Sequence, residues 1–351
     1  VLDFSRHMGR VLEVNVEERW ARVQPGTVLD DLRDLTRPHG LTFGPDPSTH
    51  SRCTLGGMIG NNSCGVHSVQ AQFFGPGPRT EDQVLELRVL TYDGVELTVG
   101  PTTDAELERI VAEGGRRGEI YAGLRALRDA HADRIREKFP DIPRRVSGYN
   151  LPALLPEGGF DVGKALVGSE GTCAITLEAK VRLIPDPPER VLVILGYEDI
   201  YHAADHVPEI LKHRPLGLEG MDDTLVDFMV RKGLNTQYLR YLPEGRGWLL
   251  AEFGGETVAE AEAAAREAKR ALEASSSRLR EAQVLVDPEE QHRIWVVRES
   301  GLGATASVPG LPPMWEGWED AAVPPEHCGN YLREFRDLLG RYGYRAALYG
   351  H

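Results

Sequence analysis

The chain has 351 residues, which is enough for about two domains of roughly 150 residues each. Hydrophobic residues make up 41% and charged residues 27%, a balance typical of globular proteins. The formal net charge of −14 argues against nucleic acid or an anionic membrane as the main partner, because both attract a basic surface.

The sequence also argues against a membrane span and against a framework built on cysteine. No apolar run approaches the roughly 20 residues that a transmembrane helix needs. The four cysteines, Cys53, Cys64, Cys173 and Cys328, form no C-x-x-C pair, so neither a zinc cluster nor a set of disulfides is expected. No signal peptide is visible, and we expect reduced thiols in a cytoplasmic protein.

Short strands and helices alternate in the first half of the chain. Strands are predicted at residues 11–14, 20–23, 84–91, 95–99 and 181–184, and helices at 28–36, 104–113 and 121–139. The turn dipeptide Asp93-Gly94 predicts a hairpin of the third and fourth strands. The proline-rich stop at 185–188 predicts a domain boundary, with one domain over residues 1–187 and a second over 188–351.

The second half of the chain repeats a strand–helix–strand pattern. Strands are predicted at residues 191–196, 248–253 and 284–286, and helices at 200–213, 258–274 and 288–299. This order predicts an α+β sandwich of the ferredoxin kind, with helices on one face of an antiparallel sheet.

The segment 44–65 is the most informative part of the sequence, because glycine, proline and small polar residues dominate it. Glycine lets a backbone approach a ligand closely and leaves its N–H groups open to anionic oxygens. Gly56-Gly57 before the apolar Met58-Ile59 predicts the start of a helix whose amides face a phosphate or a ring carbonyl. The alternative is an ordinary long surface loop.

A second glycine cluster, Gly168-Ser169-Glu170-Gly171-Thr172, stands just before a β-branched stretch that resumes a strand. It predicts a tight turn whose amides lie against a ligand. The alternative is a plain hairpin turn with no ligand.

In combination and in this order, four motifs resemble those of the FAD-linked dehydrogenases of the vanillyl-alcohol-oxidase superfamily. The match is to the branch of D-lactate, glycolate and D-2-hydroxyglutarate dehydrogenases, and it covers nearly the whole chain. The motifs are Pro45-Asp46-Pro47-Ser48, Thr54-Leu55-Gly56-Gly57, Asn62-Ser63-Cys64-Gly65 and Gly168-Ser169-Glu170-Gly171-Thr172. The resemblance implies an α+β fold, in which the second part of a PCMH-type FAD-binding domain precedes a ferredoxin-like α+β cap domain.

The resemblance also implies which residues bind FAD. They are Pro45, Asp46, Pro47, Ser48, Thr54, Gly56, Gly57, Asn62, Gly65, Gly168, Glu170, Gly171, Thr172 and Ile175. We therefore expect the segments 44–65 and 168–175 to lie side by side, with amides facing one cleft. Two features depart from the family pattern: Cys64 stands where glycine is more common, and the stretch 69–79 is longer than expected.

By the same resemblance, Arg298 is the substrate arginine, whose planar guanidinium grips an α-carboxylate through two parallel hydrogen bonds. The alternative is a surface arginine that pairs with Glu299. In relatives that act on dicarboxylates a lysine often stands two residues before the equivalent of Asp320, and here that position is Trp318. This difference favours D-lactate as the substrate, with D-2-hydroxyglutarate second.

The end of the chain, Tyr349-Gly350-His351, resembles the start of the family's H-x-G-D-G-N-x-H segment. The histidines of that segment hold a divalent metal (Zn or Mn) near the substrate, and His351 matches the first of them. The rest of the segment, any iron–sulfur ligand cysteines and the first FAD-binding subdomain would lie beyond the two ends. The sequence thus resembles an internal fragment, which we expect to be inactive alone and to hold FAD weakly.

The implied reaction is oxidation of a D-2-hydroxyacid to the 2-oxoacid, with hydride transfer from C2 to flavin N5. Electrons would then pass to a quinone, a cytochrome or an iron–sulfur module. The expected location is the cytoplasm, or the periphery of the inner membrane for the full-length protein. Two alternatives stay open: a nicotinamide-driven reductase related to the cell-wall enolpyruvyl reductases, and a folded remnant without flavin.

Overall fold

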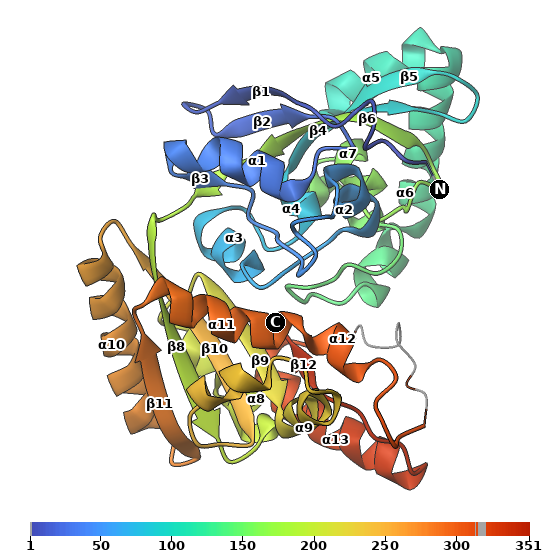
Figure 1. Ribbon diagram of the computed structural model, residues 1–351. Helices are drawn as coiled ribbons and strands as arrows, with labels where there is room; N and C mark the ends of the chain where they lie inside the picture. The colour runs from blue at the N-terminus through green and yellow to red at the C-terminus, as the bar shows by residue number, and fades with distance from the viewer. Residues whose placement is uncertain (1, 313, 315–320) are drawn as a thin grey trace. The chain divides into compact units, whose positions relative to one another are not determined.

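The computed structural model describes residues 2–312, 314 and 321–351 (Figure 1). The chain forms two compact units, Val1–Asp186 and Pro187–His351. Each unit contains a five-stranded sheet in which all neighbouring strands are antiparallel. The predicted α+β fold class is confirmed. Within the described part of the chain, no helix combines the length and the apolar character needed to cross a membrane.

The sheet of the first unit has the strand order β1-β2-β6-β4-β5. Its strands are β1 (Val11–Asn15), β2 (Trp20–Val23), β4 (Val84–Leu90), β5 (Glu96–Val99) and β6 (Ile175–Arg182). A separate two-stranded sheet pairs β3 (Leu41–Thr42) with β7 (Ile184–Pro185). Although β6 comes late in the chain, it lies between β2 and β4. The turn that leads into β6 is therefore anchored at the middle of the sheet.

Seven α-helices are described in the first unit. They are α1 (Leu29–Thr36), α2 (Leu55–Asn61), α3 (Ser68–Phe74), α4 (Thr80–Gln83), α5 (Asp104–Glu113), α6 (Gly115–Lys138) and α7 (Val162–Leu166). A capping box explains the sharp start of α5, since Thr103 accepts from the Glu106 amide and the Glu106 carboxylate accepts from the Thr103 amide. The core joins buried apolar residues of the sheet to those of the helices: Ala21, Val23, Leu29, Leu32, Leu55, Ile59, Leu87, Leu107, Tyr121 and Val181.

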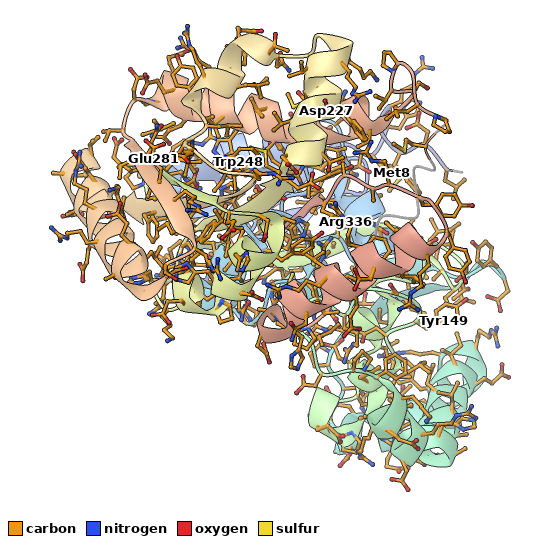
Figure 2. The ribbon with its side chains drawn as sticks, turned by 90° about the horizontal axis from the view of Figure 1, so that it is seen from below. Met8, Tyr149, Asp227, Trp248, Glu281 and Arg336 are labelled. Carbon is orange, nitrogen blue, oxygen red and sulfur yellow. The ribbon has the colours of Figure 1, made fainter. Side chains whose placement is uncertain are left out.

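The sheet of the second unit has the order β11-β8-β10-β9-β12. Its strands are β8 (Glu189–Tyr197), β9 (Gly217–Asp222), β10 (Gly247–Gly255), β11 (Leu279–Leu285) and β12 (Tyr349–Gly350). Its helices are α8 (Ile200–Leu211), α9 (Asp223–Lys232), α10 (Val258–Ser275), α11 (Pro288–Glu299), α12 (Gly301–Thr305) and α13 (Cys328–Arg341). Trp248 of β10, labelled in Figure 2, is buried and donates its indole N–H to the Pro243 carbonyl at 2.9 Å.

Helices cover both faces of this second sheet (Figure 1). Leu192 and Ile194 of β8 pack with apolar residues of α9 and α11. On the opposite face α8 and α10 lie against β8 and β10. The prediction of helices on one face is therefore wrong. The continuous apolar run 191–195 explains why helices cover both faces, because a strand segment that is apolar at every position must be buried on both sides.

Several described elements were absent from the sequence prediction, among them β9, α9 and α13 of the second unit. Strand β9 has the sequence Gly-Leu-Glu-Gly-Met-Asp, which is poor in the β-branched and aromatic residues that mark strands. It is nevertheless buried along its whole length between β10 and β12. The stretch 69–79, expected as a long loop, is partly helical because α3 extends to Phe74.

Candidate functional site

The two glycine-rich segments of the first unit are joined by backbone hydrogen bonds. The Gly168 amide donates to the Ile59 carbonyl and the Glu170 amide donates to the Gly60 carbonyl, both at 2.9 Å. The segments 44–65 and 168–175 therefore lie side by side, as predicted, whereas the expectation that their amides face one cleft stays a prediction. The role of these residues in binding FAD remains a prediction.

Gly56 and Gly65 are needed for close packing inside the protein. A Cβ built on Gly56 would lie 2.6 Å from the Pro25 Cβ, and a Cβ on Gly65 would overlap the carbonyl group of Asp46. The Gly56 amide donates to the Pro25 carbonyl at 2.8 Å. The predicted start of a helix is found at α2, but the prediction that the Gly56 amide faces a ligand is wrong, because Pro25 already accepts from it.

Gly57 and Gly171 border open space instead. Both are exposed, and nothing lies within 4 Å of a Cβ built on Gly171. A Cβ on Gly57 would have Thr54 Oγ1 as its nearest neighbour, at 3.4 Å. Gly60 lies one helical turn after Gly57 and is hydrogen-bonded to Glu170.

We call Gly57, Gly60 and Gly171 the glycine strip. Gly171 has a φ of +70°, a conformation that favours glycine. Thr172 follows it on the surface, and its hydroxyl donates to the Ser169 carbonyl at 2.6 Å. Since glycine has no side chain, a flat ring can approach the strip closely, although the Gly57 amide already donates to Thr54 and the Gly171 carbonyl already accepts from the Tyr92 hydroxyl. The residues present therefore fit bound FAD.

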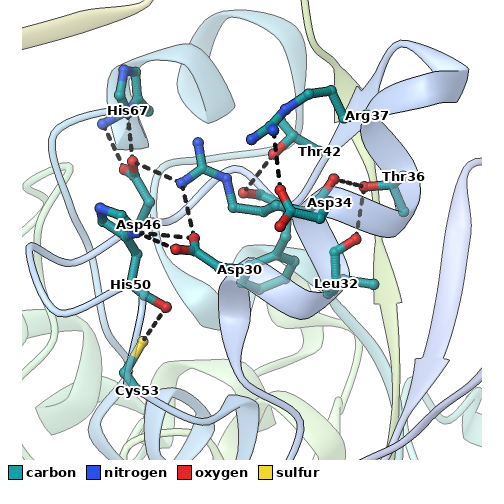
Figure 3. A network of polar contacts seen from close by, with 12 residues as sticks. Asp30, Leu32, Asp34, Thr36, Arg37, Thr42, Asp46, His50, Cys53 and His67 are labelled. Atoms are coloured by element: carbon teal, nitrogen blue, oxygen red, sulfur yellow. Dashed lines mark hydrogen bonds and ion pairs between the residues drawn. The ribbon is translucent and has the colours of Figure 1, made fainter. Parts of the chain in front are cut away.

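Asp46 is buried and held by its neighbours (Figure 3). Its carboxylate accepts from the His67 amide at 2.8 Å and from the His67 ring, and it lies 3.6 Å from the Arg33 guanidinium. Arg33 also lies 3.8 Å from Asp30, which pairs with His50 at 2.8 Å. Burial opposes ionisation of Asp46, but His67 and Arg33 outweigh it, so the pKa of Asp46 lies below its usual value. Asp46 thereby ties its loop to α1 and to the residue before α3.

The neighbouring predicted residues differ in exposure. Pro45 is buried, Pro47 is half-buried and Ser48 is exposed. Thr54 caps α2 by accepting from the Gly57 amide at 3.3 Å, and Ile175 is the half-buried first residue of β6.

Asn62 binds a buried carboxylate that the sequence analysis did not single out. Its Oδ1 accepts from the Glu81 amide at 3.0 Å, and its Nδ2 donates to the Glu81 carboxylate at 3.3 Å. The same carboxylate accepts from Asn150 and pairs with Arg79 at 2.7 Å. Burial raises the pKa of Glu81 although Arg79 opposes the rise. Since Asn62 also lies against Gly168, this cluster supports the contact between the two glycine-rich segments.

Arg298, at the end of α11 in the second unit, is paired with Glu219 of β9. Its Nε and Nη2 lie 2.8 and 2.5 Å from the same oxygen, Glu219 Oε1. Both side chains are largely shielded, with exposed fractions of 12% for Arg298 and 4% for Glu219. The guanidinium carbon lies 4.7 Å from the centre of the Tyr349 ring. The alternative interpretation, surface pairing with Glu299, is therefore wrong.

His351 lies at the same carboxylate, with its Nδ1 4.0 Å from Glu219 Oε2. Among the described residues, no group of three or more His, Cys, Asp or Glu side chains is placed to hold a metal ion. Two side chains do not make a metal site, so we derive no chemistry through one. His351 as a Zn or Mn ligand stays a prediction, and Trp318 falls outside the described residues.

Sequence reasoning missed Glu219 and Glu81. Glu219 had one available signal, since it is a single carboxylate within the apolar stretch Leu218-Glu219-Gly220-Met221. A carboxylate at such a position must be exposed or paired, and β9 buries it. Glu81 stands in the polar run 79–83, where nothing distinguishes it from a surface residue.

Two family models match the chain. The model described as "FAD binding domain" matches residues 1–114, which include the segment 44–65. The model described as "FAD linked oxidases, C-terminal domain" matches residues 186–351, which include Arg298, Glu219 and His351.

Curated relatives align along nearly the whole chain. A D-2-hydroxyglutarate dehydrogenase of Pseudomonas putida is 35% identical over all of this chain and 35% of its own length. Glycolate oxidase subunit GlcD of Bacillus subtilis is 26% identical over 99% of this chain and 60% of its own length. A D-lactate dehydrogenase of Archaeoglobus fulgidus is 27% identical over 97% of this chain and 60% of its own length. The chain thus spans about a third of the length of the first relative and more than half of the other two.

A solved structure, an alkyldihydroxyacetonephosphate synthase, has a similar fold. It aligns with a TM-score of 0.50 and 18% identity over 86% of this chain and 47% of its own. On the two family models, the chain contains an FAD-binding domain and the C-terminal domain of FAD-linked oxidases, and it is similar along nearly its whole length to hydroxyacid dehydrogenases.

Proposed function

We propose that the protein oxidises a D-2-hydroxyacid to the 2-oxoacid with FAD as the electron acceptor. One observation carries the proposal for the substrate: Arg298 is shielded and fixed, yet one edge of its guanidinium is left for an incoming group. Its Nε edge is occupied by Glu219, and Nη1 has no partner among the described residues. The Nη1–Nη2 edge retains the parallel N–H pair that a carboxylate accepts.

We assign the FAD contacts to the glycine strip, Glu170, Thr172 and Ile175. When bound there, FAD supplies the two-electron acceptor for the oxidation. Four other predicted residues support the FAD site without contacting the ligand: Asp46, Asn62, Gly56 and Gly65. The side chains of Asp46 and Asn62 are hydrogen-bonded within the protein, and the two glycines are closely packed against neighbouring residues. They hold the backbone on which the ligand would lie.

Two substrates are candidates. The relatives at 30–35% identity carry the name D-2-hydroxyglutarate dehydrogenase, which supports a dicarboxylate. Trp318, in place of a lysine, supports the monocarboxylate D-lactate. We place D-2-hydroxyglutarate first, because its named relatives are more similar over the whole chain than the D-lactate dehydrogenase at 27%.

The test is reduction of the bound flavin under anaerobic conditions. D-2-Hydroxyglutarate, D-lactate and their L enantiomers are added separately to FAD-loaded protein, and the visible flavin absorption band is followed. We expect one D acid to bleach the band and to support turnover with an artificial dye, which replaces the predicted quinone, cytochrome or iron–sulfur acceptor. Bleaching by NADPH, but by none of the acids, would instead support the reductase alternative.

A further inference from the structure

Three groups converge on the guanidinium of Arg298. Glu219 receives two of its N–H groups on a single oxygen, and the Tyr349 ring covers one face. Gly301 lies beside both, since a Cβ there would be 3.2 Å from the Tyr349 ring and 3.4 Å from Arg298 Nη1. An arginine side chain normally has several rotatable bonds, and these contacts remove that freedom.

We propose that Glu219 is a positioning residue: it occupies the Nε side of Arg298 so that the substrate carboxylate meets only the Nη1–Nη2 end. This inference rests on the proposed function, because it concerns the same substrate arginine. Glu219 comes from β9, next to the centre of the sheet, and is buried. A guanidinium fixed to a buried strand aims its free edge far better than one on an exposed helix end.

The pairing also changes what Arg298 can recognise. The Glu219 carboxylate neutralises the charge of the Arg298 guanidinium at close range. Charge attraction alone therefore adds little to the binding of a second anion. Recognition then depends on two directed hydrogen bonds, which favour a planar carboxylate over a spherical anion such as chloride. The substrate class that fits is therefore a carboxylic acid presented end-on.

Glu219→Gln and Glu219→Asp separate position from charge. Glutamine keeps an accepting oxygen at the same reach, whereas aspartate keeps the charge but withdraws both oxygens by one methylene. If Glu219 acts by position, Glu219→Gln retains most of kcat/KM, and Glu219→Asp lowers it about tenfold to a hundredfold. The loss is expected mainly in KM, because carboxylate binding is shared by the ground state and the transition state. The opposite order, with aspartate the better substitute, overturns the proposal.

Two further measurements complete the test. In a double-mutant cycle with Arg298→Lys, the Glu219→Asp loss should shrink to less than threefold, because Glu219 acts through Arg298. A fully additive loss overturns the proposal. The exposed neighbour Glu299 provides the matched control, and Glu299→Gln should stay within twofold of the wild type.

Binding of oxalate, a planar carboxylate probe, is measured by calorimetry on the 351-residue chain to separate this inference from the proposed function. FAD-loaded wild-type protein that neither binds oxalate nor oxidises any 2-hydroxyacid contradicts the proposed function. Wild-type protein that binds oxalate, with equal affinity in Glu219→Asp, contradicts the positioning role alone. We expect affinity to fall at least tenfold in Glu219→Asp and to be retained in Glu219→Gln.

Discussion

The adjacent glycines Gly56 and Gly57 should respond in opposite ways to the same substitution. In Gly56→Ala the new Cβ would lie 2.6 Å from the Pro25 Cβ and 2.8 Å from the Pro25 carbonyl oxygen, so the backbone must move. Overpacking of this kind costs about 1–3 kcal/mol. In Gly57→Ala the nearest atom is 3.4 Å away, an ordinary contact, and alanine favours the helix over glycine by about 0.5–1 kcal/mol.

Thermal or urea unfolding, followed by circular dichroism, measures both effects. For a unit of this size about 1 kcal/mol shifts the melting temperature by roughly 2–4 °C, so Gly56→Ala should melt several degrees lower and Gly57→Ala slightly higher. FAD affinity, measured by flavin fluorescence, should fall in the more stable Gly57→Ala, because its methyl group projects from the glycine strip. Equal stability of the two variants would refute the packing argument, and unchanged FAD affinity in Gly57→Ala would refute the strip as the flavin surface.

Three further predictions concern buried polar groups, and denaturant unfolding measures each of them. The first two require unfolding curves at several pH values. Burial lowers the pKa of His206, so its stabilising contribution should be complete above about pH 6.5 and decline as the pH falls below it; His206→Gln should remove this decline. Burial raises the pKa of Asp222 to about 6, so its contribution should be complete below the ordinary value of 3.8 and disappear as the pH rises through 6; Asp222→Asn should be less sensitive over that range, and an unchanged pH profile would contradict this. Asn62→Ala should cost about 2–3 kcal/mol and Asn62→Gly less, because both lose the Glu81 hydrogen bonds but only alanine is strained at the observed φ of +55°.

The His206 prediction follows from a chain of hydrogen bonds that fixes its tautomer. Ser275 donates its hydroxyl proton to the Leu272 carbonyl at 3.0 Å, so it accepts from His206 Nε2 at 2.8 Å. His206 Nδ1 must then accept from the Tyr197 hydroxyl at 2.7 Å. A second proton, on Nδ1, would force the Tyr197 hydroxyl to accept instead of donate, so the hydroxyl proton would lose its partner and the buried ring would carry a charge; acid should therefore weaken this part of the second unit.

Local patterns in the sequence predicted the strands and helices that bury one face or carry a clear cap. The helix α11 matches its predicted range, and α5 does as well, because a capping residue or a proline marks each start. Strand β9 could not be predicted, because its burial comes from β10 and β12, which lie far away in the sequence. The second helical layer on the sheet was indicated by the continuous apolar run 191–195 of β8, but the pattern was assigned to the wrong architecture.

The same limit applies to the site. Motif order predicted that two distant glycine-rich segments meet, because a ligand shared by both requires it. Motif order did not predict the buried carboxylates of Glu81 and Glu219, because a charge that is buried with a partner looks in sequence like one that is solvated. Both partners had to be brought together by the fold before either could be identified.

The glycines of the family motifs have two different physical roles, which the sequence pattern alone does not distinguish. At Gly56 and Gly65 other parts of the protein occupy the space of a side chain. A Cβ at Gly57 would make only an ordinary contact with Thr54, and one at Gly171 would have nothing within 4 Å. Packing explains the first pair completely. Nothing within the protein's own packing requires a glycine at Gly57, where alanine would favour the helix, so its absence of a side chain points to something outside the chain. A glycine that the protein's own packing does not explain is therefore stronger evidence for a bound ligand than a glycine that packing explains.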